Sequence, residues 1–210
     1  MRHLWWVLLL IASAMAPAAA AAEKRVVIRT YQSGLVSSGD LSSALSVAAD
    51  ILKTAGLEPQ WRICAEEPEQ PGSDACAEPL GPNELAIRFL RRPLSPNSAG
   101  HVPLGSSLID TRAGSGSLAT IYVDRVTGFA RDSGTQAGVL LGRAIAHEIG
   151  HLLLGTTSHT RTGLMRAVWS TRALQRNRAG DWLFTPNDAR SMRDGLFPDA
   201  PPHREGARGR

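Results

Sequence analysis

The residues best suited to chemistry in this chain are His147, Glu148 and His151, which form the pattern His-Glu-x-x-His. On a helix, residues four apart lie one turn above each other, with about 5 to 6 Å between their Cβ atoms. Two imidazoles placed in this way can bind one zinc ion at about 2.0 to 2.1 Å per bond. Glu148 is rotated about 100 degrees from His147, so its carboxylate can reach a water on that ion. The pattern therefore predicts two metal ligands, His147 and His151, and a general base, Glu148.

The segment that carries this pattern, residues 135–154, is apolar on nearly every side, which predicts a buried core helix. Arg143 and the three residues of the pattern interrupt the apolar run, which argues against a membrane span. Gly155 is expected to end the helix in a left-handed conformation. Histidine and glutamate side chains inside a core need a partner that offsets the loss of their hydration, and a metal ion meets that need.

A catalytic zinc takes three protein ligands and keeps one position open for water. Of the six histidines in the chain, His3 lies in the N-terminal segment and His203 in the C-terminal tail. His159 follows the helix after a short Gly-Thr-Thr-Ser linker, in which the glycine lets the chain turn back toward the metal. His101 lies in a loop rich in Pro and Gly and is expected at the surface. The predicted third ligand is therefore His159.

Two other ligand sets remain open at this stage. A carboxylate could be the third ligand, although Glu205 in the tail is the one glutamate after the helix, and Asp181 and Asp188 belong to no matching motif. A closed structural zinc site would need a fourth ligand, for which His101 or Asp110 is available. A structural site has no need of a carboxylate next to its first ligand, which favours the catalytic alternative.

These residues resemble the active site of the metzincin metallopeptidases. In that family the zinc helix ends at a glycine, the third ligand follows it, and a turn that contains methionine lies under the site. The corresponding positions in this chain are Gly155, His159 and the turn Gly163-Leu164-Met165. The resemblance implies that zinc is bound by His147, His151 and His159, with Glu148 as the catalytic base and Met165 as the methionine of the turn.

The resemblance covers residues 139–169 and departs from the family in its spacing. The family places its glycine three and its third histidine six residues after the second histidine, whereas Gly155 and His159 come four and eight residues after His151. No tyrosine follows Met165, although some branches have one near zinc. The departures imply a divergent branch. An ordinary core methionine is the alternative for Met165.

Hydrophobic periodicity predicts an α+β fold for the remaining elements. The crossover between the first two strands is long enough for a parallel β-α-β unit, and Ala-Gly-Ser-Gly-Ser predicts a hairpin turn at 113–117. The metzincin resemblance implies a single domain with a mixed, twisted five-stranded sheet, a backing helix, a zinc-binding helix, and an antiparallel edge strand beside the cleft. The expected strands are 25–30, 59–65, 83–91, 104–110 and 118–126, and the expected helices are 40–55, 135–154 and 187–192.

The N-terminal residues 1–22 have the three parts of a secretory signal: a basic start, an apolar run and a string of alanines. An uncleaved membrane anchor is the alternative. We expect a catalytic domain at 23–197, a disordered basic tail at 198–210, and no stable membrane anchor after signal removal. Export to the periplasm or the medium would expose Cys64 and Cys76, 12 residues apart, to oxidation, which predicts a disulfide between them.

The chain of 210 residues is long enough for one core, and its net charge of +4 comes from scattered rather than clustered basic residues. This distribution argues against a nucleic-acid partner. The sequence predicts an exported zinc-dependent metalloendopeptidase that hydrolyses peptide bonds with a zinc-activated water and Glu148 as general base. We expect a monomer that binds a protein or peptide substrate in extended conformation along 104–110.

Two other functions stay open. The first is a non-catalytic, zinc-stabilised extracytoplasmic binding module. The second is a metal hydrolase that acts on cell-wall or other amide bonds. At the strand 104–110, ordinary protection of a sheet edge is the alternative to substrate binding.

Overall fold

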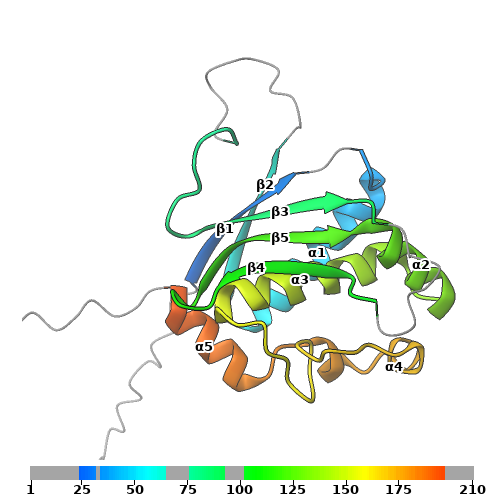
Figure 1. The fold of residues 1–210 in the computed structure, drawn as a ribbon. Helices are drawn as coiled ribbons and strands as arrows, with labels where there is room; N and C mark the ends of the chain where they lie inside the picture. The colour runs from blue at the N-terminus through cyan, green and yellow to red at the C-terminus, as the bar shows by residue number, and fades with distance from the viewer. Residues whose placement is uncertain (1–23, 32–33, 65–75, 93–101, 197–210) are drawn as a thin grey trace, which may run out of the picture.

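The fold is built on one five-stranded sheet, as seen in a computed structural model that describes residues 24–31, 34–64, 76–92 and 102–196 (Figure 1). The strand order is β2-β1-β3-β5-β4, in which the first four strands are parallel neighbours and β4 pairs antiparallel with β5 at the edge. This arrangement confirms the predicted α+β class, the mixed sheet and the antiparallel edge strand. The strands are β1 (Lys24–Tyr31), β2 (Leu57–Cys64), β3 (Glu84–Leu90), β4 (Gly105–Asp110) and β5 (Ser115–Tyr122).

Two long helices, α1 (Ser38–Thr54) and α3 (Ala137–Leu154), lie side by side against one face of the sheet (Figure 1). Their close approach depends on Gly142, because a Cβ there would lie 2.5 Å from the carbonyl oxygen of Ala44. The apolar side chains between these helices and the sheet form the core. The other helices are α2 (Val123–Ser133), α4 (Thr171–Arg176), the 3-10 turn η1 (Ala179–Trp182) and α5 (Pro186–Leu196).

The helix α3 is the predicted core helix. Of the helices in the described ranges, it is the one long and apolar enough to cross a membrane by length and composition, and 78% of it is buried inside the protein. Its C-cap is Gly155 with φ 60°, so the predicted left-handed end is confirmed. The helix begins at Ala137, two residues later than expected.

The predicted strand 118–126 is wrong in its second half. The strand β5 ends at Tyr122, and α2 begins at Val123. Val123, Val126 and Ala130 are buried at spacings of three and four residues, which is the helical period. The β-branched residues of this short segment masked that period in the sequence. The short elements α4 and η1 were also not predicted.

The start of α1 differs from the expectation that Asp40 caps it. Ser37 is the N-cap, and its Oγ accepts a hydrogen bond from the backbone N–H of Asp40 at 3.1 Å. Asp40 lies within the first turn, where a carboxylate also interacts favourably with the helix dipole. Both residues are good caps, so the sequence did not distinguish them.

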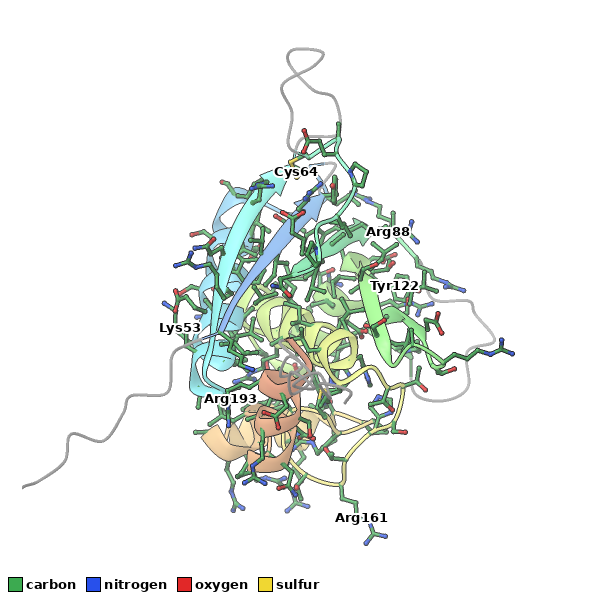
Figure 2. The ribbon with its side chains drawn as sticks, turned by 90° about the vertical axis from the view of Figure 1, so that its left-hand side faces the viewer. Lys53, Cys64, Arg88, Tyr122, Arg161 and Arg193 are labelled. Carbon is green, nitrogen blue, oxygen red and sulfur yellow. A yellow bond between two sulfur atoms is a disulfide. The ribbon has the colours of Figure 1, made fainter. Side chains whose placement is uncertain are left out.

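The predicted disulfide joins Cys64 and Cys76 (Figure 2), which confirms that pairing. Beside it, the buried guanidinium of Arg29 forms an ion pair with Glu84 and donates a hydrogen bond to the carbonyl oxygen of Glu78 at 2.6 Å. Arg62 forms a second ion pair with Glu84 at 3.3 Å. The predicted signal segment, the basic tail and His101 lie outside the described residues.

Candidate metal centre and cleft

The structure brings the three predicted histidine ligands together at the C-terminal half of α3. The Nε2 atom of His151 lies 3.1 Å from that of His147 and 3.3 Å from that of His159. The ligand atoms of the three residues all lie within 4.8 Å of one another. Two nitrogens bound to one tetrahedral zinc at 2.0 to 2.1 Å lie about 3.3 Å apart. The spacing of the three imidazoles therefore fits a zinc ion.

Hydrogen bonds on the far side of two of these rings fix which nitrogen is free. Nδ1 of His147 donates to the carbonyl oxygen of Leu164 at 2.9 Å, and Nδ1 of His151 donates to that of Thr156 at 2.8 Å. A carbonyl only accepts, so in each neutral ring Nδ1 carries the proton and Nε2 has a free lone pair. The two lone pairs face each other, and a cation between them would remove their repulsion.

Burial keeps these imidazoles neutral. It lowers the pKa of His147 to about 4 and also lowers the pKa values of His151 and His159. Neutral imidazole is the form that binds a metal, so the rings need not lose a proton at neutral pH. The chemistry of this donor set therefore agrees with its geometry.

Gly155 turns the chain so that His159 returns to the site. Its φ of 60° lies in the left-handed region, which favours glycine. A Cβ at Gly155 would overlap the carbonyl group of Gly114 in the β4–β5 turn. The glycine thus serves two purposes: it ends α3, and it lets the hairpin turn pack against the start of the loop that carries His159.

Met165 is buried against α3 and is 1% exposed. It packs against Gly150, where a Cβ would lie 2.6 Å from the Met165 sulfur and 2.6 Å from a ring carbon of Phe184. Its backbone carbonyl accepts a hydrogen bond from Thr160 N–H at 2.9 Å, which closes the segment 160–165 directly after His159. The residue before it supplies the carbonyl that orients His147. The turn 163–165 therefore supports the site in two ways: Leu164 orients His147, and Met165 packs against Gly150 of α3.

The carboxylate of Glu148 is held by the edge strand β4. Ser107 Oγ donates to Glu148 Oε2 at 2.6 Å, and a Cβ at Gly105 would lie 2.7 Å from Glu148 Oε1. Burial raises the pKa of Glu148 to about 7, although the hydrogen bond from Ser107 opposes that rise. Neither strand residue was predicted from the sequence. They lie two apart on a predicted strand, so the period of two could have placed them on one face.

A cavity of about 600 Å³ opens beside the three histidines and Glu148. One wall belongs to β4 and another to α2, a helix that was not predicted from the sequence. Trp169 also lines it, and its indole stands edge-on to the His147 ring with 5.5 Å between centroids. The apolar residues of the lining include Leu104, Phe129, Ala144 and Val168. The site is thus a histidine cluster that could hold a metal ion, at the wall of a largely apolar cleft.

The alternative carboxylate ligands lie elsewhere. Asp181 forms an ion pair with Arg166 at 3.2 Å, and Asp188 accepts hydrogen bonds from Thr185 at the start of α5. Asp110 accepts backbone hydrogen bonds in the β4–β5 turn. Within the part of the chain that the structure describes, no fourth metal-binding side chain joins the three histidines.

Comparison with known proteins gives structural but no sequence matches. Family models and curated protein sequences yielded none. A solved zinc-dependent peptidase from Methanocorpusculum labreanum aligns with a TM-score of 0.51 and 14% identity over 79% of this chain and 99% of its own. Archaemetzincin from Methanopyrus kandleri aligns with a TM-score of 0.53 and 15% identity over 89% of this chain and 99% of its own. At these identities the likeness shows that this chain shares their fold.

Proposed function

We propose that this protein is an exported, zinc-dependent endopeptidase of the metzincin type. The observation that carries the proposal is the convergence of three neutral imidazoles, two of them with their Nε2 atoms 3.1 Å apart, beside a buried carboxylate. The two solved proteins of similar fold are a zinc-dependent peptidase and an archaemetzincin, which supports the same chemistry. The HExxHxxxGxxxH spacing and the turn at Met165 support a divergent metzincin.

Each residue of the site would have a distinct role. His147, His151 and His159 would hold the zinc ion, which when bound polarises a carbonyl and lowers the pKa of a water. Glu148 is the general base: a carboxyl with a pKa of about 7 can accept a proton from the attacking water and release it to the leaving nitrogen near neutral pH. Because Ser107 donates a hydrogen bond to Glu148 Oε2, Oε1 would be the oxygen that accepts that proton.

The substrate would bind as an extended strand along β4. This strand pairs with β5 on one side only, so its other edge offers main-chain hydrogen bonds to a peptide. The cavity beside β4 and the histidines would take a side chain next to the scissile bond. The peptide carbonyl would thereby come close to both Glu148 and the metal ligands.

The test is bound zinc per chain together with cleavage of a denatured protein, in wild type and in His159→Ala. We expect one zinc per wild-type chain, chelator-sensitive cleavage, and loss of both zinc affinity and cleavage in the variant. Cleavage unaffected by chelator would overturn the proposal. Stoichiometric zinc without cleavage of any protein or peptide would instead favour the zinc-stabilised binding module.

Export is the second part of the proposal. The signal-like segment 1–22 and the disulfide between Cys64 and Cys76 support an oxidising compartment outside the cytoplasm. Fractionation of expressing cells, with the N-terminus of the product sequenced, tests it. A cytoplasmic product that begins at Met1 would contradict export without affecting the zinc chemistry.

A further inference from the structure

A second cavity, of about 510 Å³, lies between the end of α2, the first turns of α3 and α4. It shares no lining residue with the cavity at the three histidines. Six of its nine lining residues have polar side chains, among them Gln136, Arg143, Gln175 and Asn177. The proposed reaction uses none of these residues, so the cavity needs its own explanation.

Arg143 is the charged group of this cavity, and it is 7% exposed. Its guanidinium lies over the ring of Trp182, with Cζ 4.1 Å from the ring centroid, and Nη2 donates to Asn177 Oδ1. Among the residues that the structure describes, no carboxylate forms an ion pair with it, and its other N–H groups have no protein acceptor. A guanidinium has five N–H donors in a planar fork, so most of this fork is free.

The second buried arginine, Arg29, has a carboxylate partner, which Arg143 lacks among the described residues. Arg29 is 3% exposed and pairs with Glu84. Burial lowers its pKa, but Glu84 and Tyr31 together outweigh burial, so the pKa ends above its usual value. Burial alone lowers the pKa of Arg143 to about 10. Both remain charged at neutral pH, and a buried charge without a counterion is unfavourable.

The N-terminal end of α3 faces the same cavity. Its N-cap, Gln136, makes no side-chain capping hydrogen bond, and its first turn contains no acidic residue. Gln136 and Val139 line the cavity, as does Arg143 one turn further on. An uncapped helix start presents unpaired backbone N–H groups and the positive end of the helix dipole. Two independent sources of positive potential therefore meet at one cavity.

We propose that this cavity is a binding site for a small oxyanion, namely a sulfate, a phosphate or a carboxylate, held by Arg143 and the N-terminal end of α3. Such an anion would complete the planar fork of Arg143 and satisfy the start of α3. The ring of Trp182 fixes the guanidinium in place, which reduces the entropy lost on binding. This site does not depend on the proposed peptidase function.

The test is thermal unfolding of the zinc-loaded chain titrated with sodium sulfate or sodium acetate, against sodium chloride at equal ionic strength. We expect the midpoint to rise by about 3 to 6 °C when the bound anion exceeds its Kd tenfold. The two arms distinguish a tetrahedral anion from a carboxylate. The indole N–H resonance of Trp182 should shift with the same Kd, because that ring lies against Arg143.

Arg143→Gln should abolish both responses, whereas Arg131→Gln should keep them. Arg131 carries the same charge near the end of α2 but does not line the cavity. If Arg143→Gln does not fold, Gln136→Glu serves in its place, because a carboxylate at the cavity should raise the midpoint without anion and remove the response to it. Equal responses in wild type and these variants, or none in wild type, would overturn the proposal.

Discussion

The two halves of α3 are similarly buried, but the first half makes close packing contacts with α1, whereas the second half makes hydrogen bonds that orient polar side chains. In the first half, Gly138 and Gly142 allow α1 to approach, and a side chain there would meet backbone and side chains of that helix. In the second half, three of the buried residues are polar, namely His147, Glu148 and His151, and each contacts a group outside the helix that orients it. The first half determines how closely the helix packs, whereas the second half determines where its functional atoms point. Substitutions should therefore separate stability from chemistry along one helix.

The largest effect is expected for Glu148→Gln, which removes the general base and keeps its shape. Cleavage should fall by at least about a thousandfold, while zinc per chain stays at the wild-type value. The unfolding midpoint at pH 8 should not fall, because the raised pKa of Glu148 means that its ionised form is unfavourable in the fold above pH 7. Glu58→Gln, on β2, is the control and should change neither cleavage nor zinc content. Substantial cleavage by Glu148→Gln would refute the assigned base.

Gly142→Ala tests the first half of α3. The new Cβ would lie 2.5 Å from the Ala44 carbonyl oxygen and 2.7 Å from Val47 Cβ, so we expect a loss of about 2 to 3 kcal/mol in the free energy of unfolding. Zinc affinity and kcat of the folded protein should stay unchanged. Gly39→Ala is the matched control, because a Cβ at Gly39 has open space, and it should be neutral or slightly stabilising. Chemical denaturation measures the free energy of unfolding of both variants. Equal losses in the two variants would contradict the close packing of α1 and α3 as the cause of the loss in Gly142→Ala.

Gly155→Ala tests the end of the second half. The left-handed φ of 60° and the overlap with Gly114 should together cost about 2 kcal/mol and displace the Thr156 carbonyl that orients His151. We expect zinc affinity to fall about tenfold or more. Gly134 has a similar φ of 68° but open space around it, so Gly134→Ala should show the backbone strain alone. Competitive zinc titration of the two variants separates backbone strain from the overlap with Gly114. Equal zinc affinity in both variants would mean that the overlap with Gly114 does not affect zinc binding.

The smallest effect is expected for Ser107→Ala, which removes the hydrogen bond to Glu148 Oε2. Loss of a hydrogen bond to a charged group corresponds to about tenfold in kcat, with KM and zinc content unchanged. Ser107→Thr retains a hydroxyl and should restore part of the rate. Ser106→Ala is the control, since Ser106 contacts the Tyr122 hydroxyl at 3.0 Å instead. A change in KM alone would show that Ser107 acts on substrate binding and not on the base.

The sequence predicted most of the sheet and the long helices because their signals are local. Strand alternation, the apolar run of α3 and the glycine at its end each depend on residues that are neighbours along the chain. The helix α2 was missed because the β-branched residues at 123 and 126 suit a strand as well as a buried helix face, and packing decided between them. Local sequence likewise did not decide between Ser37 and Asp40 as the start of α1, because both residue types are good N-caps.

The sequence by itself determined which groups can bind a metal and act as a base, because the spacing of His147, Glu148 and His151 on one helix is a matter of local geometry. Only the tertiary structure decided where these groups point. The partners that orient them, the carbonyls of Leu164 and Thr156 and the hydroxyl of Ser107, come from other segments. The physical reason is that a side chain's orientation and pKa depend on contacts across the fold, and no periodicity in the chain encodes those contacts.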